Sequence, residues 1–254
     1  MGEGAAPRVR QIAGAAAIDA ALRAREDVRL VLVADDARSP DVRELLARAR
    51  QSGAEVRSAT RNVLARLSAP RPPAEVLALA GRDPEASLAD SLARGGAFWL
   101  LVGVAYPGNV GMAIRTAEVS GADGIAIDGR FDHEAKRAAL RASMRADKFM
   151  AVLWQQARDV LERACAAGHL AFALDESGSQ AHYEADLTGP RVFVVGGEHG
   201  GIPAEVLARC DARIRVPMAG FIPCYNLQAA VSAVAVERLR QLALAPRSAS
   251  VNQP

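Results

Sequence analysis

Three short segments of the sequence combine glycine and proline with polar side chains that could take part in group-transfer chemistry. YPGNVGMAIRTA, from residue 106, contains Asn109 and Arg115, and GGEHGGIP, from residue 196, contains Glu198. VPMAGFIPCYNL, from residue 216, contains Asn226. Glycine allows a backbone to approach a ligand closely, while amide, carboxylate and guanidinium groups supply hydrogen-bond donors and acceptors. These four polar residues are therefore the first candidates for a functional site.

Ordinary structural roles would also explain each of these residues if it stood alone. Arg115 could be a surface charge or a positioned functional group. Glu198 could stabilise the positive end of the following helix, and Asn226 could be a helix N-cap. The glycines around Glu198 lack the Lys-Ser/Thr pair of a phosphate loop and the GxGxxG spacing of a dinucleotide site. Nucleoside triphosphate and dinucleotide sites are therefore not indicated.

An alternation of strands and helices from residue 97 onward should position these segments. Strands are predicted at 97–105, 124–128, 169–175, 191–197 and 212–218, and helices at 109–120, 132–145, 154–167, 203–210 and 225–242. This alternation predicts an α/β fold with a parallel sheet and helices on both faces. Each polar segment follows a strand, Asn109 is expected to cap its helix, and open parallel sheets bind ligands at that edge.

The residues before 97 predict a separate and smaller α/β unit. Strands are expected at 28–33, 55–58 and 76–80, with helices that begin at Ser39 and Thr60 and a helical pattern from Ile12 to Leu22. Prolines and glycines then mark a connection. The predicted organisation is a small domain at 1–85, a linker at 86–96, a larger domain at 97–245 and a disordered tail at 246–254.

Composition excludes several classes of protein. The chain has 254 residues, a formal net charge of +2 and three cysteines. Cys165, Cys210 and Cys224 are scattered and form neither a zinc-binding nor a disulfide pattern, so no metal is expected. Charges interrupt every apolar stretch, and the first residues lack the apolar core of a signal peptide. We therefore expect a cytoplasmic protein that does not associate with membranes.

Taken together, the three segments resemble the conserved motifs of the SpoU (TrmH) family of RNA ribose 2′-O-methyltransferases. N-V-G-x-x-x-R-T-A, G-G-E-x-x-G-I-P and V-P-M-x-G-x-x-x-C-Y-N-L agree with that family in order, spacing and placement, over roughly residues 98–242. The resemblance implies a SPOUT-like sheet with a C-terminal trefoil knot, S-adenosylmethionine as cofactor, and a homodimer. The first 80 residues resemble the small RNA-recognition domain, similar to ribosomal protein L30e, that often precedes this catalytic domain.

The resemblance also assigns roles to individual residues. Arg115 would act on the ribose hydroxyl, at the site of the partner subunit, while Asn109, Glu198 and Asn226 would order the site. Because a guanidinium holds its proton far above neutral pH, Arg115 must either lose it in an unusual environment or stabilise the forming alkoxide while gripping a phosphate. The cofactor would be held largely by backbone groups of Leu174, Gly196, Gly197, Val216, Met218 and Tyr225.

RNA contact is expected along the predicted helix at 132–145. Arg137, Arg141 and Arg145 are spaced four apart, and Lys148 follows. Alone, this row would be a solvated face with Glu134 as a counter-ion; beside the motifs it favours phosphate binding. The additional N-terminal domain favours 23S rRNA over tRNA as substrate, with antibiotic self-resistance as one role for such an enzyme.

The third motif departs from the usual family pattern at two positions. Cys224 and Tyr225 stand where the family usually has serine and leucine, and a thiol is the weaker hydrogen-bond donor. Gln228 also replaces a small polar residue, and Arg145 stands where many relatives have glycine. These departures leave an RNA-binding relative with impaired catalysis as one alternative. A tRNA 2′-O-methyltransferase is the alternative with respect to substrate.

Overall fold

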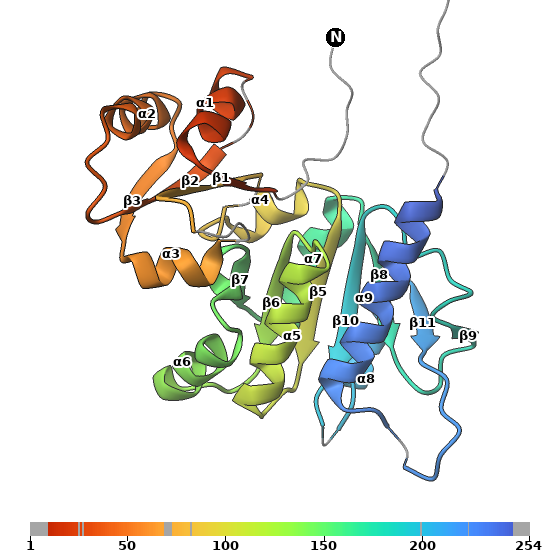
Figure 1. The fold of residues 1–254 in the computed structure, drawn as a ribbon. Helices are drawn as coiled ribbons and strands as arrows, with labels where there is room; N and C mark the ends of the chain where they lie inside the picture. Colours follow the sequence, from red (N-terminus) through yellow and green to blue (C-terminus); the bar gives the residue numbers. More distant parts are fainter. Residues whose placement is uncertain are drawn as a thin grey trace, which may run out of the picture. The chain divides into compact units, whose positions relative to one another are not determined.

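The computed structural model describes residues 10–24, 26, 28–68, 73–81, 83–198, 200–222 and 224–245. The chain divides into two compact units, Met1–Asp83 and Pro84–Pro254, which are drawn in Figure 1. The tail predicted at 246–254 lies outside the described residues. Within the described part, no helix combines the length and the apolar character needed to cross a membrane.

The first unit contains a mixed four-stranded sheet in the order β1-β4-β2-β3, which confirms the three strands predicted there. Ile12 lies in a strand instead of the predicted helix, because Gly14, with φ of 91°, turns the chain before the helix begins. Thr60 caps its helix as predicted, accepting a hydrogen bond from the Val63 amide. The elements are β1 (Arg10–Ala13), α1 (Ala15–Arg23), β2 (Val28–Ala34), α2 (Pro40–Gln51), β3 (Glu55–Ala59), α3 (Arg61–Leu67) and β4 (Val76–Ala80).

The second unit contains seven strands in the order β7-β6-β5-β10-β8-β11-β9, and all neighbours are parallel, as the alternating pattern predicted. Five of these strands were predicted, and β7 and β9 were not. The strands are β5 (Ala97–Val102), β6 (Gly124–Asp128), β7 (Ala151–Trp154), β8 (Leu170–Leu174), β9 (Gln180–Ala181), β10 (Arg191–Gly196) and β11 (Ala212–Arg215). The helices are α4 (Leu88–Leu92), α5 (Pro107–Val119), α6 (His133–Ala142), the 3-10 turn η1 (Ala146–Lys148), α7 (Ala157–Ala166), α8 (Ala204–Leu207) and α9 (Leu227–Leu244).

Helices cover both faces of the parallel sheet, as predicted. Alternate residues of β5 point to opposite faces, so Trp99 packs with Ile114 of α5 and Val231 of α9 in one core cluster. Phe98 belongs to the other cluster, which includes Val160 of α7 and residues of α4 and α8. Helices α5 and α9 lie side by side on the first face (Figure 1).

Several predicted boundaries were wrong. Helix α5 begins at Pro107 with Tyr106 as its N-cap, because proline fits the first helical position, where an amide hydrogen would have no partner. Asn109 therefore lies in the first turn and does not cap the helix. Trp154, where a helix was predicted to begin, is the last residue of strand β7, and α7 starts only at Ala157. The stretch predicted as a linker at 86–96 contains α4, which Ser87 caps.

Helix α6 is shorter than predicted. Asp132 caps its first turn, but the helix ends at Ala142. Met144 and Arg145 then adopt positive φ angles of 55° and 73°, which no α-helix can continue through. Arg145 therefore does not extend the row formed by Arg137 and Arg141, which corrects the prediction of one continuous basic face.

Candidate active site

The carboxyl ends of β5, β10, β8 and β11 lie next to one another, because these strands are consecutive neighbours in the sheet. The loops after them carry the three polar segments. Gly197 makes this convergence possible: its amide donates to the Val102 carbonyl at 2.7 Å, and a Cβ there would lie 2.0 Å from the Gly103 oxygen. A side chain at this position would therefore separate the β5 and β10 loops.

A cavity of about 430 Å³ opens at this edge of the sheet. Its volume lies within the range of roughly 300–1,000 Å³ that is typical of small-molecule sites. All six residues predicted to hold the cofactor line it: Leu174, Gly196, Gly197, Val216, Met218 and Tyr225. Glu198 and Asn226 also line it, whereas Asn109 and Arg115 do not.

Other residues of the cavity wall were missed by the sequence analysis. Asp175 and Glu176 directly follow β8, so their position after a parallel strand was the available signal. Ile202, in the loop after β10, and Ala230, on α9, also line the cavity. Ala230 lies one helical turn after Asn226, and only the start of α9 could have indicated it.

A chain of hydrogen bonds joins the three segments at the cavity. The Gln228 amide donates to Asn226 Oδ1 at 2.9 Å, so Asn226 caps α9. Asn226 Nδ2 donates to Asn109 Oδ1 at 3.2 Å, and Asn109 Nδ2 donates to Glu198 Oε1 at 2.6 Å. Glu198 Oε2 is buried and has no hydrogen-bond partner among the described residues. The chain thus ends on an acceptor that a bound ligand could use.

Arg115 lies apart from this chain of hydrogen bonds. Its side chain is exposed, and it makes no hydrogen bond or ion pair within the described part of the chain. Asn109 and Arg115 are six residues apart on α5, which directs them about 120° from each other around the helix. Arg115 is therefore presented to the surface of the chain.

The loop before α9 is closed by the unusual tyrosine of the third segment. Tyr225 donates its hydroxyl hydrogen to the Pro217 carbonyl at 3.2 Å. Cys224 is exposed and lines the cavity. The larger Tyr225 side chain thus ties the two ends of the loop together while forming part of the cavity wall.

The residues predicted to bind RNA are all exposed: Arg137, Arg141, Arg145 and Lys148. Lys148 forms an ion pair with Asp147 at 3.3 Å. Helix α6 is fixed against α5 at Gly111, where a Cβ would lie 2.4 Å from the Ala142 Cβ. This close packing holds the basic segment in a defined position relative to the helix that carries Asn109 and Arg115.

Comparison with known families covers both units. Residues 97–236 match the SpoU rRNA Methylase family. Residues 11–84 match the family described as RNA 2′-O ribose methyltransferase substrate binding. The division between these matches falls close to the boundary between the two compact units.

Individual relatives are distant in sequence. The chain is 28% identical over 148 residues to the 23S rRNA (guanosine-2′-O-)-methyltransferase RlmB of Pseudomonas putida, covering 56% of this chain and 58% of that protein. It is 28% identical over 141 residues to a 23S rRNA (uridine(2479)-2′-O)-methyltransferase of Streptomyces viridochromogenes, covering 53% and 49%. The alignments therefore span about half the length of these curated relatives.

The fold likeness extends further than these alignments. The crystal structure of an AdoMet-bound rRNA methyltransferase from Sinorhizobium meliloti matches with a TM-score of 0.57 and 25% identity. That match covers 92% of this chain and 88% of the other. The chain therefore has a SPOUT-like α/β fold preceded by a mixed four-stranded domain.

Proposed function

Because the chain belongs to the SpoU rRNA Methylase family, we propose that it transfers a methyl group from S-adenosylmethionine to a ribose 2′-hydroxyl of RNA. The observation that carries this proposal is the cavity at the three strand ends. The six residues expected to hold the cofactor line it, together with Glu198 and Asn226. No other part of the described chain gathers all three motifs.

The chemistry of the cavity wall fits S-adenosylmethionine. Leu174, Val195 and Ile202 provide apolar surface for a flat adenine ring. The carboxylates of Asp175, Glu176 and Glu198 suit a ligand that carries a sulfonium and an ammonium charge. The orphaned Glu198 Oε2 is a further sign that a donor or a cation belongs in this space.

The residues around the cavity would position the reacting groups. When bound, S-adenosylmethionine supplies an electrophilic methyl carbon, so positioning of the ribose hydroxyl in line with it accounts for much of the rate. Asn226 and Asn109 hold the Glu198 carboxylate in one orientation. Arg115 would stabilise negative charge on the ribose oxygen as the hydroxyl proton leaves, while gripping a neighbouring phosphate.

A homodimer would bring Arg115 to the cavity of a partner subunit. In its own subunit Arg115 is exposed and outside the cavity. Helix α5, which carries Arg115, and the neighbouring helix α9 have exposed apolar side chains, including Met112 and Val119 on α5 and Val236 on α9. Burial of these side chains between two copies would stabilise a dimer. The trefoil knot expected for this family remains a prediction of the same proposal.

Ribosomal 23S RNA is the proposed substrate, in the cytoplasm. The match of residues 11–84 to a substrate-binding family supports a structured RNA, and the relatives named above act on 23S rRNA. Methyl transfer from labelled S-adenosylmethionine to unmodified 23S rRNA, but not to tRNA, is the expected result. Label in tRNA alone would support the alternative substrate, and label in neither RNA would contradict the proposed activity. Self-resistance would appear as antibiotic sensitivity in cells that lack the gene.

Mixing two inactive variants tests whether Arg115 acts in the partner's site. Arg115→Ala and Glu198→Gln should each be inactive alone. In a mixed dimer, one of the two sites combines an intact cavity with an intact Arg115. When equal amounts of the two variants exchange freely, half of the dimers are mixed, so about a quarter of the wild-type activity per chain should return. No recovery, with mixed dimers demonstrated, would show that Arg115 does not act across the dimer.

A further inference from the structure

The turn between α6 and η1 has a backbone conformation that side-chain-bearing residues rarely adopt. Met144 and Arg145 have φ angles of 55° and 73°, and they are the positive-φ residues other than glycine in the described part of the chain. This region favours glycine and tolerates asparagine or aspartate, whose short side chains can hydrogen-bond locally. Methionine and arginine offer no such compensation, so this turn is strained relative to a glycine turn.

Packing holds the turn on both sides but does not use its two side chains. Ser143 is fully buried, and its hydroxyl donates to the Leu140 carbonyl at 2.7 Å. Ala146, after the turn, is also buried. By contrast, Met144 is 69% exposed, and the Arg145 side chain is exposed and makes no hydrogen bond or ion pair with the described residues. The strain is therefore not offset by burial of the strained residues.

The surroundings of the turn are cationic. Five basic residues between positions 132 and 148 outnumber three carboxylates there. Two of the carboxylates are already used: Asp132 caps α6, and Asp147 pairs with Lys148. An exposed guanidinium that lacks an acidic partner on a basic surface suits a phosphate group, which it can bind through two parallel hydrogen bonds.

We propose that the Met144–Arg145 turn is a contact for the RNA backbone, and that its strained conformation is retained for binding. This inference rests on the proposed function insofar as it takes RNA as the ligand. Arg145 binds a phosphate, and Met144 packs its flexible side chain against the adjoining nucleotide. Because α6 is packed tightly on α5, this contact sets the RNA at a fixed position relative to Asn109 and Arg115.

Replacement of Arg145 by glycine separates stability from binding. Arg145→Gly should raise the melting temperature by about 2–4 °C, because glycine adopts this φ without strain. The same variant should weaken the affinity for a labelled RNA hairpin by about tenfold and reduce the slope of log affinity against log salt by about one. Fluorescence anisotropy at several salt concentrations measures both quantities.

Two matched variants complete the experiment. Arg145→Lys keeps both the charge and the strained backbone, so its melting temperature and salt slope should stay close to those of the wild type. Arg163→Ala removes a cation from α7, which packs on the opposite face of the sheet, and should leave the salt slope unchanged.

Opposite changes in stability and affinity are therefore the expected signature of Arg145→Gly. A lower or unchanged melting temperature, or an unchanged salt slope, would overturn the inference. A wild-type protein that does not bind the hairpin would overturn it as well. Methyl transfer is measured separately, so a protein that binds RNA through Arg145 without transferring a methyl group would contradict the proposed function alone.

Discussion

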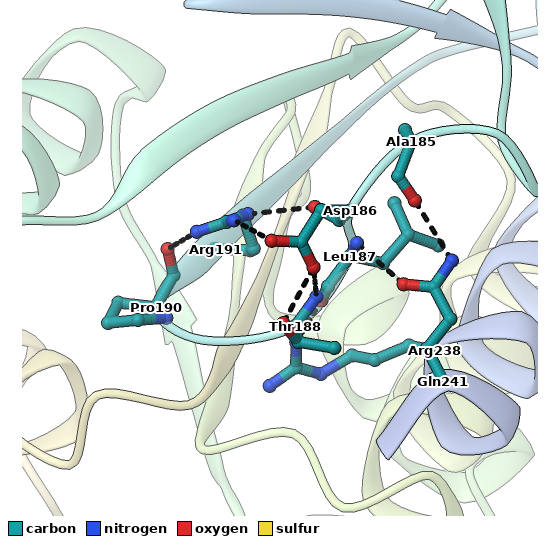
Figure 2. A network of polar contacts seen from close by, with 8 residues as sticks. All are labelled: Ala185, Asp186, Leu187, Thr188, Pro190, Arg191, Arg238 and Gln241. Atoms are coloured by element: carbon teal, nitrogen blue, oxygen red, sulfur yellow. Dashed lines mark hydrogen bonds and ion pairs between the residues drawn. The ribbon is translucent and has the colours of Figure 1, made fainter. Parts of the chain in front are cut away.

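Helix α9 carries a polar network near each of its ends, and the two networks differ in how completely they are paired. At its N-terminal end, the capping residue Asn226 bonds to Asn109 and Asn109 bonds to Glu198, whose Oε2 is buried without a protein partner in the described chain. In its last turns, α9 meets the loop before β10, where the polar groups of Gln241 are bonded to protein (Figure 2).

In the network of Figure 2, side chains of α9 form hydrogen bonds with the backbone of the loop before β10. Gln241 accepts from the Leu187 amide at 2.8 Å and donates to the Ala185 carbonyl at 2.9 Å. Arg238 of the same helix donates to the Leu187 carbonyl. Nearby, Asp186 forms an ion pair with Arg191 at 3.2 Å. This network attaches the end of α9 to the loop that leads into β10.

The unpaired oxygen of the Glu198 network indicates a role in binding, whereas the fully paired Gln241 network indicates a role in stability. A buried polar atom without a partner costs stability, by about 1–3 kcal/mol, and Glu198 belongs to the wall of a cavity in which a ligand could complete it. A closed network needs no ligand and contributes to stability directly. Substitutions at the Glu198 network should therefore change activity, and those at the Gln241 network should change stability.

Glu198→Gln should have the largest effect. Glutamine keeps an oxygen for the Asn109 amide but replaces the unpartnered acceptor with a donor. We expect the rate of methyl transfer to fall by about 100-fold or more, with an unchanged or higher melting temperature. Glu176→Gln, at an exposed position on the same cavity, is the matched control and should lose far less activity. Wild-type turnover by Glu198→Gln would remove Glu198 from the account.

Gln241→Leu should have the next largest effect, on stability. The Leu187 amide and the Ala185 carbonyl would both lose their partner, at a total cost of about 2–4 kcal/mol in the free energy of unfolding. Urea unfolding measures this loss. A loss of turnover without a loss of stability would reverse the roles assigned to the two networks.

Glu237→Gln should have the smallest effect, and one that depends on pH. Hydrogen bonds from Arg240 and Gln241 lower the pKa of Glu237 from 4.5 to about 2. A carboxylate with a lowered pKa contributes stability above about pH 4.5 and loses it as the pH falls toward 2. The difference in urea midpoint between Glu237→Gln and the wild type should therefore shrink from pH 7 to pH 3. A difference that stays constant over this range would contradict the assignment.

The strand ends could be predicted from sequence because each has a local signal. Buried runs such as residues 97–102, followed by glycine, proline and a polar residue, identified the edge of the sheet at which the cavity lies. Asn226 begins its helix as its type suggests. These features depend on neighbours within a few residues, and the periodicity of the sequence reports on such neighbours.

The pairings between distant segments could not be predicted in this way. Asn109 is 89 residues from Glu198, and Gln241 is 54 residues from Leu187. Asn109 was expected to serve its own helix, but Pro107 starts that helix earlier and leaves the Asn109 amide for Glu198. The left-handed turn at Arg145 was also missed, because arginine gives no local signal for a positive φ.

The most direct test of the central claim is calorimetric titration of S-adenosylmethionine into the wild type and two neighbouring α9 variants. Ala230 lines the cavity, whereas Ala229 is exposed outside it. The account predicts saturable binding to the wild type and to Ala229→Phe, and its loss in Ala230→Phe with the same melting temperature as Ala229→Phe. Absence of binding to the wild type, or undiminished binding to Ala230→Phe, would contradict the assignment of this cavity as the cofactor site.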